Sequence, residues 1–431
     1  MAQAETIREP SRETPVLKRT GVLVVGGGAA GVSAAVAAAR EGADVTLVER
    51  YGSLGGLATG GLIALLLTLD DGRGVPVIGG LCQETVDRLQ RAGGAYHPPR
   101  EQWGSDDPAQ VDDAFRWGLV WGGMRASHRV RYSVAYDPEV MRQVLAEMVC
   151  EAGVDLIFHM WGADALRSDE PEKGLDGVLF QSKAGRTAIL ADVVIDATGD
   201  GDVFASAGCR FELERVHPWL WFRLGGVDGD PNEIDRSTGY FRTTNPGQVL
   251  LPWGSAARID RRIDATDPRD LTFAELECRR LVMEEVEKLR ASRPEMAHAH
   301  ICNIATQLGI TESRRLVGEH VLTRDDVDHD FDDAIAITGH WTKYAAVYAI
   351  PYRCLHTAAA PNLLAAGRHI SVDHRVHHAT KEIPACMAVG EAAGIAAHLA
   401  LDAGARASAV DVQKLRAQLR ARGALLDYFS G

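Results

Sequence analysis

Cysteine is scarce in this sequence, and no two cysteines form a Cys-x-x-Cys pair. The seven cysteines stand singly, at positions 82, 150, 209, 278, 302, 354 and 386. A dithiol–disulfide reductase needs a closely spaced pair, and an odd, scattered set gives no framework of disulfides. We therefore exclude dithiol chemistry and expect reduced thiols in a cytoplasmic protein.

Long apolar runs and an excess of positive charge are also missing. The most apolar run that we identify, residues 62–69, is far shorter than the ~20 residues that cross a bilayer. The first 18 residues lack the apolar core of a signal peptide. Lys and Arg number 46 against 59 Asp and Glu, which gives a formal net charge of −13. We therefore expect neither a nucleic acid nor a membrane as partner, whereas a small substrate remains compatible with this charge.

A glycine-rich turn between two apolar strands is the most informative motif. Residues 22–25 form an apolar run, which Gly26, Gly28 and Gly31 follow directly. Gly26 permits the tight turn, Gly28 lets the backbone approach a pyrophosphate, and Gly31 lets helix and strand pack closely. The helix start, which includes Ala29 and Ala30, offers free N–H groups to the pyrophosphate. Glu49 ends the second strand, where a carboxylate can accept from a ribose hydroxyl. This order of elements predicts a dinucleotide-binding βαβ unit.

A second glycine-rich turn indicates which dinucleotide is bound. It follows Glu49 at once and includes Arg50, Gly55, Gly56, Leu57 and Ala58. Such a turn suits a backbone that runs along a cofactor beyond its adenosine, as FAD requires and NAD does not. Two further strands end in turns, one with Ala197, Thr198, Gly199 and Asp202, and one with Gly367 and Arg368.

With these motifs, the chain resembles the glutathione-reductase-like FAD-dependent oxidoreductases, and more narrowly the broad family related to fumarate-reductase-type flavoproteins. The resemblance covers about residues 18–425 and includes residues 78–80, 136–139, 309–319 and 350–353. It implies an α/β fold in which a Rossmann-like FAD-binding domain, with a parallel sheet and a β meander, carries an inserted α+β substrate domain. It also implies that FAD contacts the helix of small residues that begins with Pro384, Ala385, Cys386 and Met387. It does not fix a reaction.

The motifs lie near both ends of the chain, so we expect two interleaved lobes. The main sheet should contain strands 22–25, 45–49, 154–158, 193–197 and 362–366, with helices at 81–91, 140–151, 272–292 and 411–423. The expected ranges are a flexible N-terminal arm (1–17), three parts of the FAD-binding domain (18–67, 136–203 and 350–431, the last with a C-terminal helix), a loop-rich excursion (68–135) and the substrate domain (204–349).

FAD should be bound without a covalent bond, because residues 52–69 beside the second glycine turn contain no His, Cys or Tyr. Flavin chemistry also needs a proton-transfer group and a positive field near the ring. The densest cluster of titratable side chains precedes Pro384. It resembles a family pattern in which Ser371, His374, His377 and Pro384 match, while His378 replaces a glycine and Lys381 an arginine.

We expect His374 and His377 to transfer protons, since histidine near its ordinary pKa can accept and return one. Lys381 should hold an anionic substrate group or the reduced flavin. Arg314, near Glu312, would either clamp a carboxylate or donate a proton, as in fumarate-reductase-like relatives, or form an ion pair between lobes. Both interpretations of Arg314 stay open.

The four histidines of residues 369–378 also suggest a metal site. We see no pair among them that would share one face of a helix, and Arg375 and Lys381 would oppose a cation. We therefore expect no metal. Trp219, Trp221, His340 and Tyr344 would line a substrate pocket, although aromatic residues on alternating positions are often core. Arg353 is either a substrate clamp or one half of an ion pair.

The sequence therefore predicts an FAD-dependent oxidoreductase that acts on a small organic molecule. The first hypothesis is a dehydrogenase or oxidase in which the substrate gives hydride to flavin N5. The second is a monooxygenase or reductase that uses NAD(P)H, which the lack of a second GxGxxG motif disfavours without excluding it. A non-redox or RNA-modifying function fits the acidic balance worst. The sequence leaves open whether NAD(P)H or O₂ is the redox partner and whether the chain forms a homo-oligomer.

Overall fold

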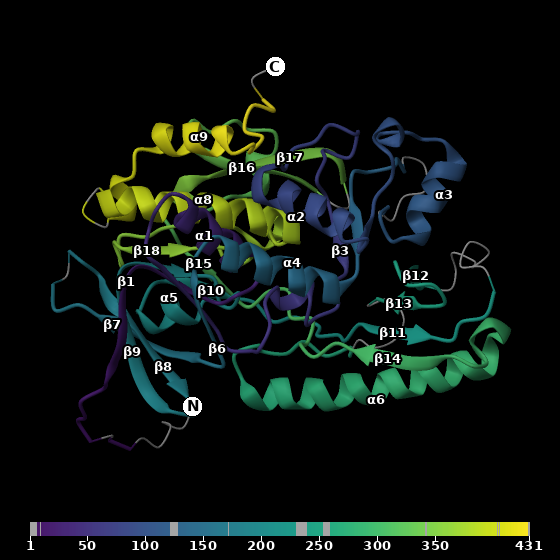
Figure 1. Cartoon of the computed structure of the whole chain (residues 1–431), viewed down its shortest axis with the longest axis horizontal. Coiled ribbons are helices and arrows are strands. Elements are labelled where there is room, and N and C mark those ends of the chain that lie inside the picture. The colour runs from purple at the N-terminus through teal and green to yellow at the C-terminus, as the bar shows by residue number, and fades with distance from the viewer. Residues whose placement is uncertain are drawn as a thin grey trace.

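A seven-stranded sheet forms the left part of the protein in Figure 1. The computed structural model describes residues 7–8, 10–120, 128–170, 172–229, 239–252, 259–340, 343–402, 404 and 406–429, without the side chains of 343–345. The parallel strands of the seven-stranded sheet are ordered β6 (Asp155–Phe158), β2 (Val45–Glu49), β1 (Val16–Val25), β9 (Gly185–Asp196) and β18 (Leu363–Ala365). The expected mostly parallel sheet, completed from the far end of the chain, is confirmed.

The expected β meander is also present. The first half of β9 pairs antiparallel with β8 (Leu175–Ser182), which pairs with β7 (Trp161–Arg167). The start of β1 also pairs with the first half of β9, since Val16 lies opposite Ala188. The N-terminal arm was expected to reach residue 17, and the pairing of β1 with β9 already includes Val16.

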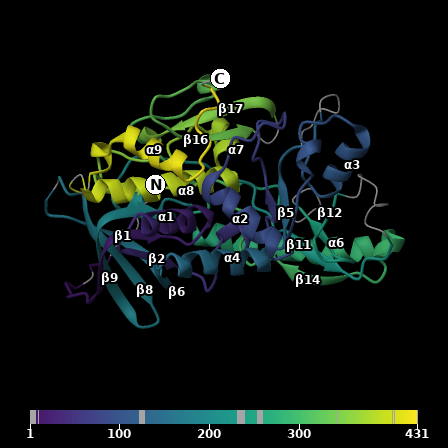
Figure 2. The same ribbon diagram turned by 45° about the horizontal axis from the view of Figure 1, so that its top comes forward.

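Two tightly packed helices, α1 (Ala29–Arg40) and α8 (Ile383–Asp402), cover one face of the sheet (Figure 2). Glycines allow this close approach, since a Cβ atom at Gly390 would lie 2.1 Å from the Ala30 carbonyl oxygen, and one at Gly394 would lie 2.2 Å from that of Ala34. By length and composition α8 could cross a membrane, but 89% of its apolar window is buried inside the protein. The longest apolar stretch is therefore this core helix, not residues 62–69.

Helices α2 (Gly80–Arg91), α4 (Pro138–Glu151) and α9 (Val412–Ala421) surround this pair (Figure 1). A side chain caps α4 at its start, because the Asp137 carboxylate accepts from the backbone N–H of Glu139 at 2.7 Å. Such a cap satisfies a donor that the helix itself leaves free.

A second, four-stranded sheet has its own core. Its order is β12 (Phe241–Arg242), β13 (Val249–Leu251), β11 (Phe222–Gly225) and β14 (His300–Ile304), and the long helix α6 (Pro268–Ser292) packs beneath it in Figure 1. The helix starts four residues before the expected 272, because Asp267 accepts from the Arg269 N–H and Pro268 suits the first turn.

The chain passes several times between the two cores. β16 (Ala334–His340) and β17 (Lys343–Pro351) pair with each other, and their buried residues belong to the core of α1 and α8. These strands fall within the expected substrate range, so the packing of that range is divided between both cores. The domain limits themselves stay a prediction. The remaining short elements are β3 (Leu65–Leu66), β4 (Ala95–Tyr96), α3 (Pro108–Arg116), β5 (Val134–Tyr136), α5 (Asp202–Ser206), β10 (Phe211–Leu213), β15 (Arg314–Leu316) and α7 (His374–Thr380).

Candidate functional site

A cavity of about 500 Å³ opens where the parallel strands end. In an open parallel sheet, the turns that follow the carboxyl ends of the strands form the ligand crevice. Seventeen of the expected cofactor residues line it: Gly26, Gly28, Ala29, Ala30, Glu49, Arg50, Gly55, Gly56, Leu57, Ala58, Ala197, Thr198, Gly199, Asp202, Gly367, Arg368 and Cys386.

The first glycine turn is shaped for a close ligand. Gly26 has φ +106°, and a Cβ there would lie 2.4 Å from the Ala197 carbonyl oxygen. A Cβ at Gly28 would meet no atom within 4 Å, so this position is left open toward the cavity. No side chain caps the start of α1, which leaves its first N–H groups for an anion. Gly31 does not line the cavity; its Cβ would lie 1.8 Å from the Gly26 oxygen, so it serves helix–strand packing.

The carboxylate of Glu49 is fixed at the end of β2. Its Oε2 accepts from the Gly27 N–H at 2.6 Å, and its Oε1 accepts from the Tyr51 N–H at 2.8 Å. Arg50 lies between two rings, 5.0 Å from Tyr51 and 4.8 Å from Trp161. Because each carboxylate oxygen has a further lone pair, Glu49 can still accept from a ribose hydroxyl.

Two arginines are bound by carboxylates of the turn after β9. Arg368 lies 2.8 Å from Asp200, and Arg314 lies 2.9 Å from Asp202. Burial raises the pKa of Asp202, and the neighbouring Asp200 raises it further. Burial also acts on Asp200, but Arg368 and the Ser313 hydroxyl outweigh it, so the pKa of Asp200 is lowered. Arg314 therefore lines the cavity as part of an ion pair.

The start of α8 presents one helical face to the cavity. Glu382, Ile383 and Cys386 line it, whereas Pro384, Ala385 and Met387 do not. Positions three and four residues apart share a face, and the positions between them turn into the core. Contact of Pro384, Ala385 and Met387 with FAD stays a prediction. Burial raises the pKa of Cys386 to about 12, so this thiol stays protonated at neutral pH.

The histidine segment reaches the cavity through Lys381 alone. Lys381 lines it, with Nζ 3.4 Å from Glu382 Oε1, whereas His374 and His377 do not. Both histidines lie against Glu312 instead, with Nδ1 at 2.9 Å for His374 and 3.5 Å for His377. His377 is 1% exposed, and neither ring nitrogen has a hydrogen-bond partner among the described residues. Burial lowers the pKa of His377 well below its ordinary value, and Lys381 lowers it further.

Glu214, Glu312 and His374 bring potential metal-ligating atoms within 4.8 Å of one another. His374 and His378 also share a face of α7, with ring centroids 5.8 Å apart, so the sequence argument that no such pair exists is wrong. Arg262 lies 3.3 Å from Glu214, and the Nε of Arg315 lies 2.8 Å from Glu312. These arginines already compensate both carboxylates, and the absence of a metal stays a prediction.

The expected substrate residues lie elsewhere. Trp219 and Trp221 are buried in the core of the second sheet, because their side chains pack inward just before β11. His340 is buried at the end of β16, and Arg353 forms a two-point ion pair with Asp333 at 2.9 and 3.1 Å. None of these four lines the cavity. The side chain of Tyr344 lies outside the described part of the structure.

Sequence reasoning missed the wall that the second sheet supplies. Its members come from the end of β14 and the start of α6, far from the glycine turns in sequence. They are Ala265, Thr266, Pro268, Leu271, Glu275, Gln307, Leu308, Ile310 and Thr311. No motif of the first 200 residues predicts them; the resemblance of residues 309–319 to the family was the available signal.

The fold is similar to that of known flavoenzymes. A geranylgeranyl bacteriochlorophyll reductase-like protein from Thermoplasma acidophilum has a TM-score of 0.52 and 14% identity, over 94% of this chain and 84% of that chain. For p-nitrophenol 4-monooxygenase PnpA from Pseudomonas putida DLL-E4 the TM-score is 0.47 and the identity 12%, over 95% of this chain and 87% of that chain. For L-proline dehydrogenase from P. horikoshii the TM-score is 0.45 and the identity 13%, over 95% of this chain and 100% of that chain. At these identities the first likeness shows the fold alone.

Sequence comparison identifies the family. No curated protein sequence matches the chain. The family described as FAD dependent oxidoreductase matches residues 21–419, which is nearly the whole chain. The glycine turns, Glu49 and the open position at Gly28 fit the cofactor of that family. The chain therefore belongs to the FAD-dependent oxidoreductases, and its cofactor is FAD.

Proposed function

We propose that this protein oxidises a small organic molecule by hydride transfer to FAD, as a dehydrogenase or an oxidase. FAD bound in the cavity supplies the two-electron acceptor. The observation that carries the proposal is the continuity of the cavity, which runs from the turn at Gly28 to Lys381 and to Thr311 of the second wall. A substrate at that end would lie between side chains of both cores, away from the pyrophosphate turn.

Lys381 is the cationic side chain that we propose for the substrate. Arg314 and Arg368 line the same cavity, but each has a carboxylate at hydrogen-bond distance. The contact of Lys381 with Glu382 is longer, at 3.4 Å, and burial raises the pKa of Glu382. A longer contact with a carboxyl group whose pKa is raised leaves Lys381 able to pair with an anionic group of the substrate.

We propose that His377, Glu312 and His374 carry the substrate proton to the surface from the end of the cavity beside Lys381. Lys381 follows His377 by four residues, so both lie on one side of the helical turn. His377 is uncharged because burial lowers its pKa, so it would hold a substrate proton only briefly before passing it to Glu312. Glu312 joins it to His374, whose side chain is 47% exposed. The cavity would thus exchange protons with solvent without opening to water.

The competing function is a monooxygenase or reductase that takes electrons from NAD(P)H. Anaerobic mixing of the FAD-loaded protein with alcohols, amines and hydroxy acids, each with and without NAD(P)H, separates the two. We expect one substrate class to bleach the flavin absorbance without NAD(P)H. Bleaching by NAD(P)H alone would contradict the dehydrogenase proposal. Binding of RNA at moderate salt would favour the third, RNA-modifying hypothesis.

We also propose non-covalent attachment of FAD and a cytoplasmic location. All seven cysteines are free thiols, which agrees with a reducing compartment. Acid precipitation tests the attachment, since non-covalent FAD remains in the supernatant. Flavin that precipitates with the protein would contradict it.

A further inference from the structure

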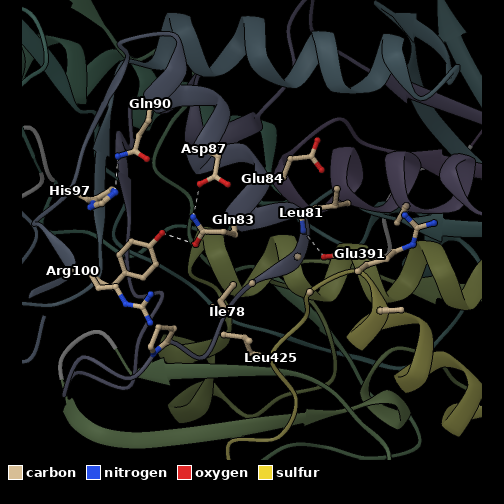
Figure 3. Close-up of a pocket in the computed structure, with 18 of the residues that line it drawn as sticks. Ile78, Leu81, Gln83, Glu84, Asp87, Gln90, His97, Arg100, Glu391 and Leu425 are labelled. Atoms are coloured by element: carbon tan, nitrogen blue, oxygen red, sulfur yellow. Dashed lines mark hydrogen bonds between the residues drawn. The ribbon is translucent and has the colours of Figure 1, made fainter.

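A second cavity, of about 880 Å³, lies at the opposite end of α1 (Figure 3). Ala37 and Arg40 at the end of α1 line it, about 14 Å along the helix from Gly28 at 1.5 Å per residue. The other walls are one side of α2, residues 97–103, Glu391 of α8 and the segment 421–425. No residue lines both cavities, so the FAD site does not account for this one.

The innermost polar group of this second cavity is the carboxylate of Glu391, which is 1% exposed. Its Oε2 accepts from the Leu81 N–H at 2.8 Å, so it caps α2 (Figure 3). Its Oε1 has no hydrogen-bond partner among the described residues. A buried acceptor without a donor costs about 1–3 kcal/mol of free energy, which indicates that a donor from outside the chain belongs there.

The charged groups around Glu391 are already paired. Arg40 of α1 binds Glu84 of α2 at 2.7 and 2.9 Å, and Arg422 binds Glu41 at 2.6 Å. Glu391 is therefore the carboxylate beside these pairs that neither arginine binds. Arg91, Arg100 and Asp87 also line the cavity, so a cationic group is inferred from Glu391 itself and not from the net charge of the lining.

The rest of the cavity offers apolar and aromatic surface. Ile78 and Leu425 lie between the carboxylate end and the Arg100 end in Figure 3. The Tyr132 ring stacks on Trp103 at 3.9 Å, and its hydroxyl donates to Gln83 at 2.6 Å. Tyr132 therefore presents an aromatic surface whose polar atom is already satisfied.

We propose that this cavity is a second ligand site, which takes a small organic monocation. Its primary ammonium group donates to Glu391 Oε1, and its apolar part packs against Ile78, Leu425 and Tyr132. The pKa of Glu391 is raised by burial to about 7. Because the ammonium group prefers the ionised carboxylate, binding should tighten as the pH rises through that value and should release a proton. Arg40, Glu84 and Arg422 are the charged groups that face Glu391.

Calorimetric titration of the FAD-loaded protein tests the proposal with benzylammonium, butylammonium and the neutral benzyl alcohol. At pH near 8 we expect at least one ammonium probe to bind at least about tenfold more tightly than the alcohol, a difference of ~1.4 kcal/mol. Repetition in buffers of different ionisation enthalpy should show proton release near pH 7. Equal affinity for cation and alcohol, or no binding of either cation, would overturn the proposal.

Two isosteric variants assign the binding to one carboxylate. Glu391→Gln keeps an acceptor for the Leu81 N–H and removes the charge, so ammonium affinity should fall at least about tenfold. Asp87→Asn removes a charge from the same cavity, where the Asp87 carboxylate accepts from the Gln83 side chain at 2.8 Å, and affinity should stay within about threefold. Flavin absorbance and circular dichroism check that both variants fold. Unchanged affinity in a folded Glu391→Gln variant would refute the site.

Discussion

The cavities at the two ends of α1 are built from different parts of the chain. Backbone forms most of the FAD cavity: glycine turns after four parallel strands, and the free N–H groups at the start of α1. Side chains form the second cavity, from α2, α8 and the segment 421–425. A site made of backbone needs glycine at fixed spacing and is therefore visible in sequence. A site made of side chains depends on which elements meet, and sequence spacing does not report that.

The buried carboxylates of the two cavities show the same difference. The Glu49 carboxylate accepts one backbone N–H on each oxygen. One donor is Tyr51, two residues away, and the other is Gly27 of the first glycine turn. Glu391 has one backbone donor, the Leu81 N–H, 310 residues away in sequence. Glu49 thus completes a local motif, whereas Glu391 joins two distant helices and keeps one oxygen unsatisfied.

The largest expected effect separates cofactor binding from folding. Gly28→Val places a side chain in open space, since a Cβ there meets no atom within 4 Å. The variant should fold normally but lose FAD, with affinity reduced by at least about 100-fold, or ~2.7 kcal/mol. Flavin absorbance after gel filtration and circular dichroism measure the two properties. Glu391→Gln, in the other cavity, is the control and should keep its FAD; a yellow Gly28→Val protein would show that the turn does not approach the cofactor.

The next prediction concerns proton transfer at the FAD cavity. Loss of a general base typically slows a reaction by ~10²–10⁴-fold, and His377→Ala should slow flavin reduction by that order with normal FAD content. Lys381→Met should instead raise KM for an anionic substrate. Stopped-flow reduction at saturating substrate separates these effects. If both variants reduce at the wild-type rate and affinity, the proton leaves by another route.

A third prediction uses the pKa of Glu391, which is raised from 4.5 to about 7. The folded protein then binds more protons than the unfolded chain between these values, so stability should fall as the pH rises from about 4.5 to about 7. A pKa shift of this size corresponds to a change of about 2–4 kcal/mol in the free energy of unfolding. Glu391→Gln should remove that slope, and thermal unfolding from pH 5 to about pH 8 measures it. Parallel pH profiles for the two proteins would contradict the raised pKa.

The smallest effect is expected outside both cavities. Arg353→Met breaks the ion pair with Asp333, in which the arginine side chain is 47% exposed. Such exposed pairs contribute about 0–1 kcal/mol. The free energy of unfolding, measured in denaturant, should change by no more than that, and the rate of flavin reduction should not change. A large increase in KM would restore Arg353 as a substrate clamp, one of its two interpretations from sequence.

Local patterns were sufficient for the strands of the main sheet, the helix α4, and most of the turns that line the FAD cavity. Each of these depends on residues close in sequence, such as Gly26 and Gly28, whose roles follow from backbone geometry alone. The sequence also determined that α8 starts beside the cofactor. It did not determine which face of α8 lines the FAD cavity. Ala385 and Met387, which were expected to contact FAD, are buried in the core and do not line the cavity.

Tertiary packing decided which side chains reach a cavity. Lys381 lines the FAD cavity and His377 does not, although they are four residues apart, because His374 and His377 pack against Glu312. Gln307 and Thr311 reach the cavity only because the second sheet packs over it. Glu391 meets Leu81 only because α8 and α2 pack together. Backbone shape is set by neighbours in the chain, whereas contacts between side chains are set by which surfaces bury one another, and that depends on the whole fold.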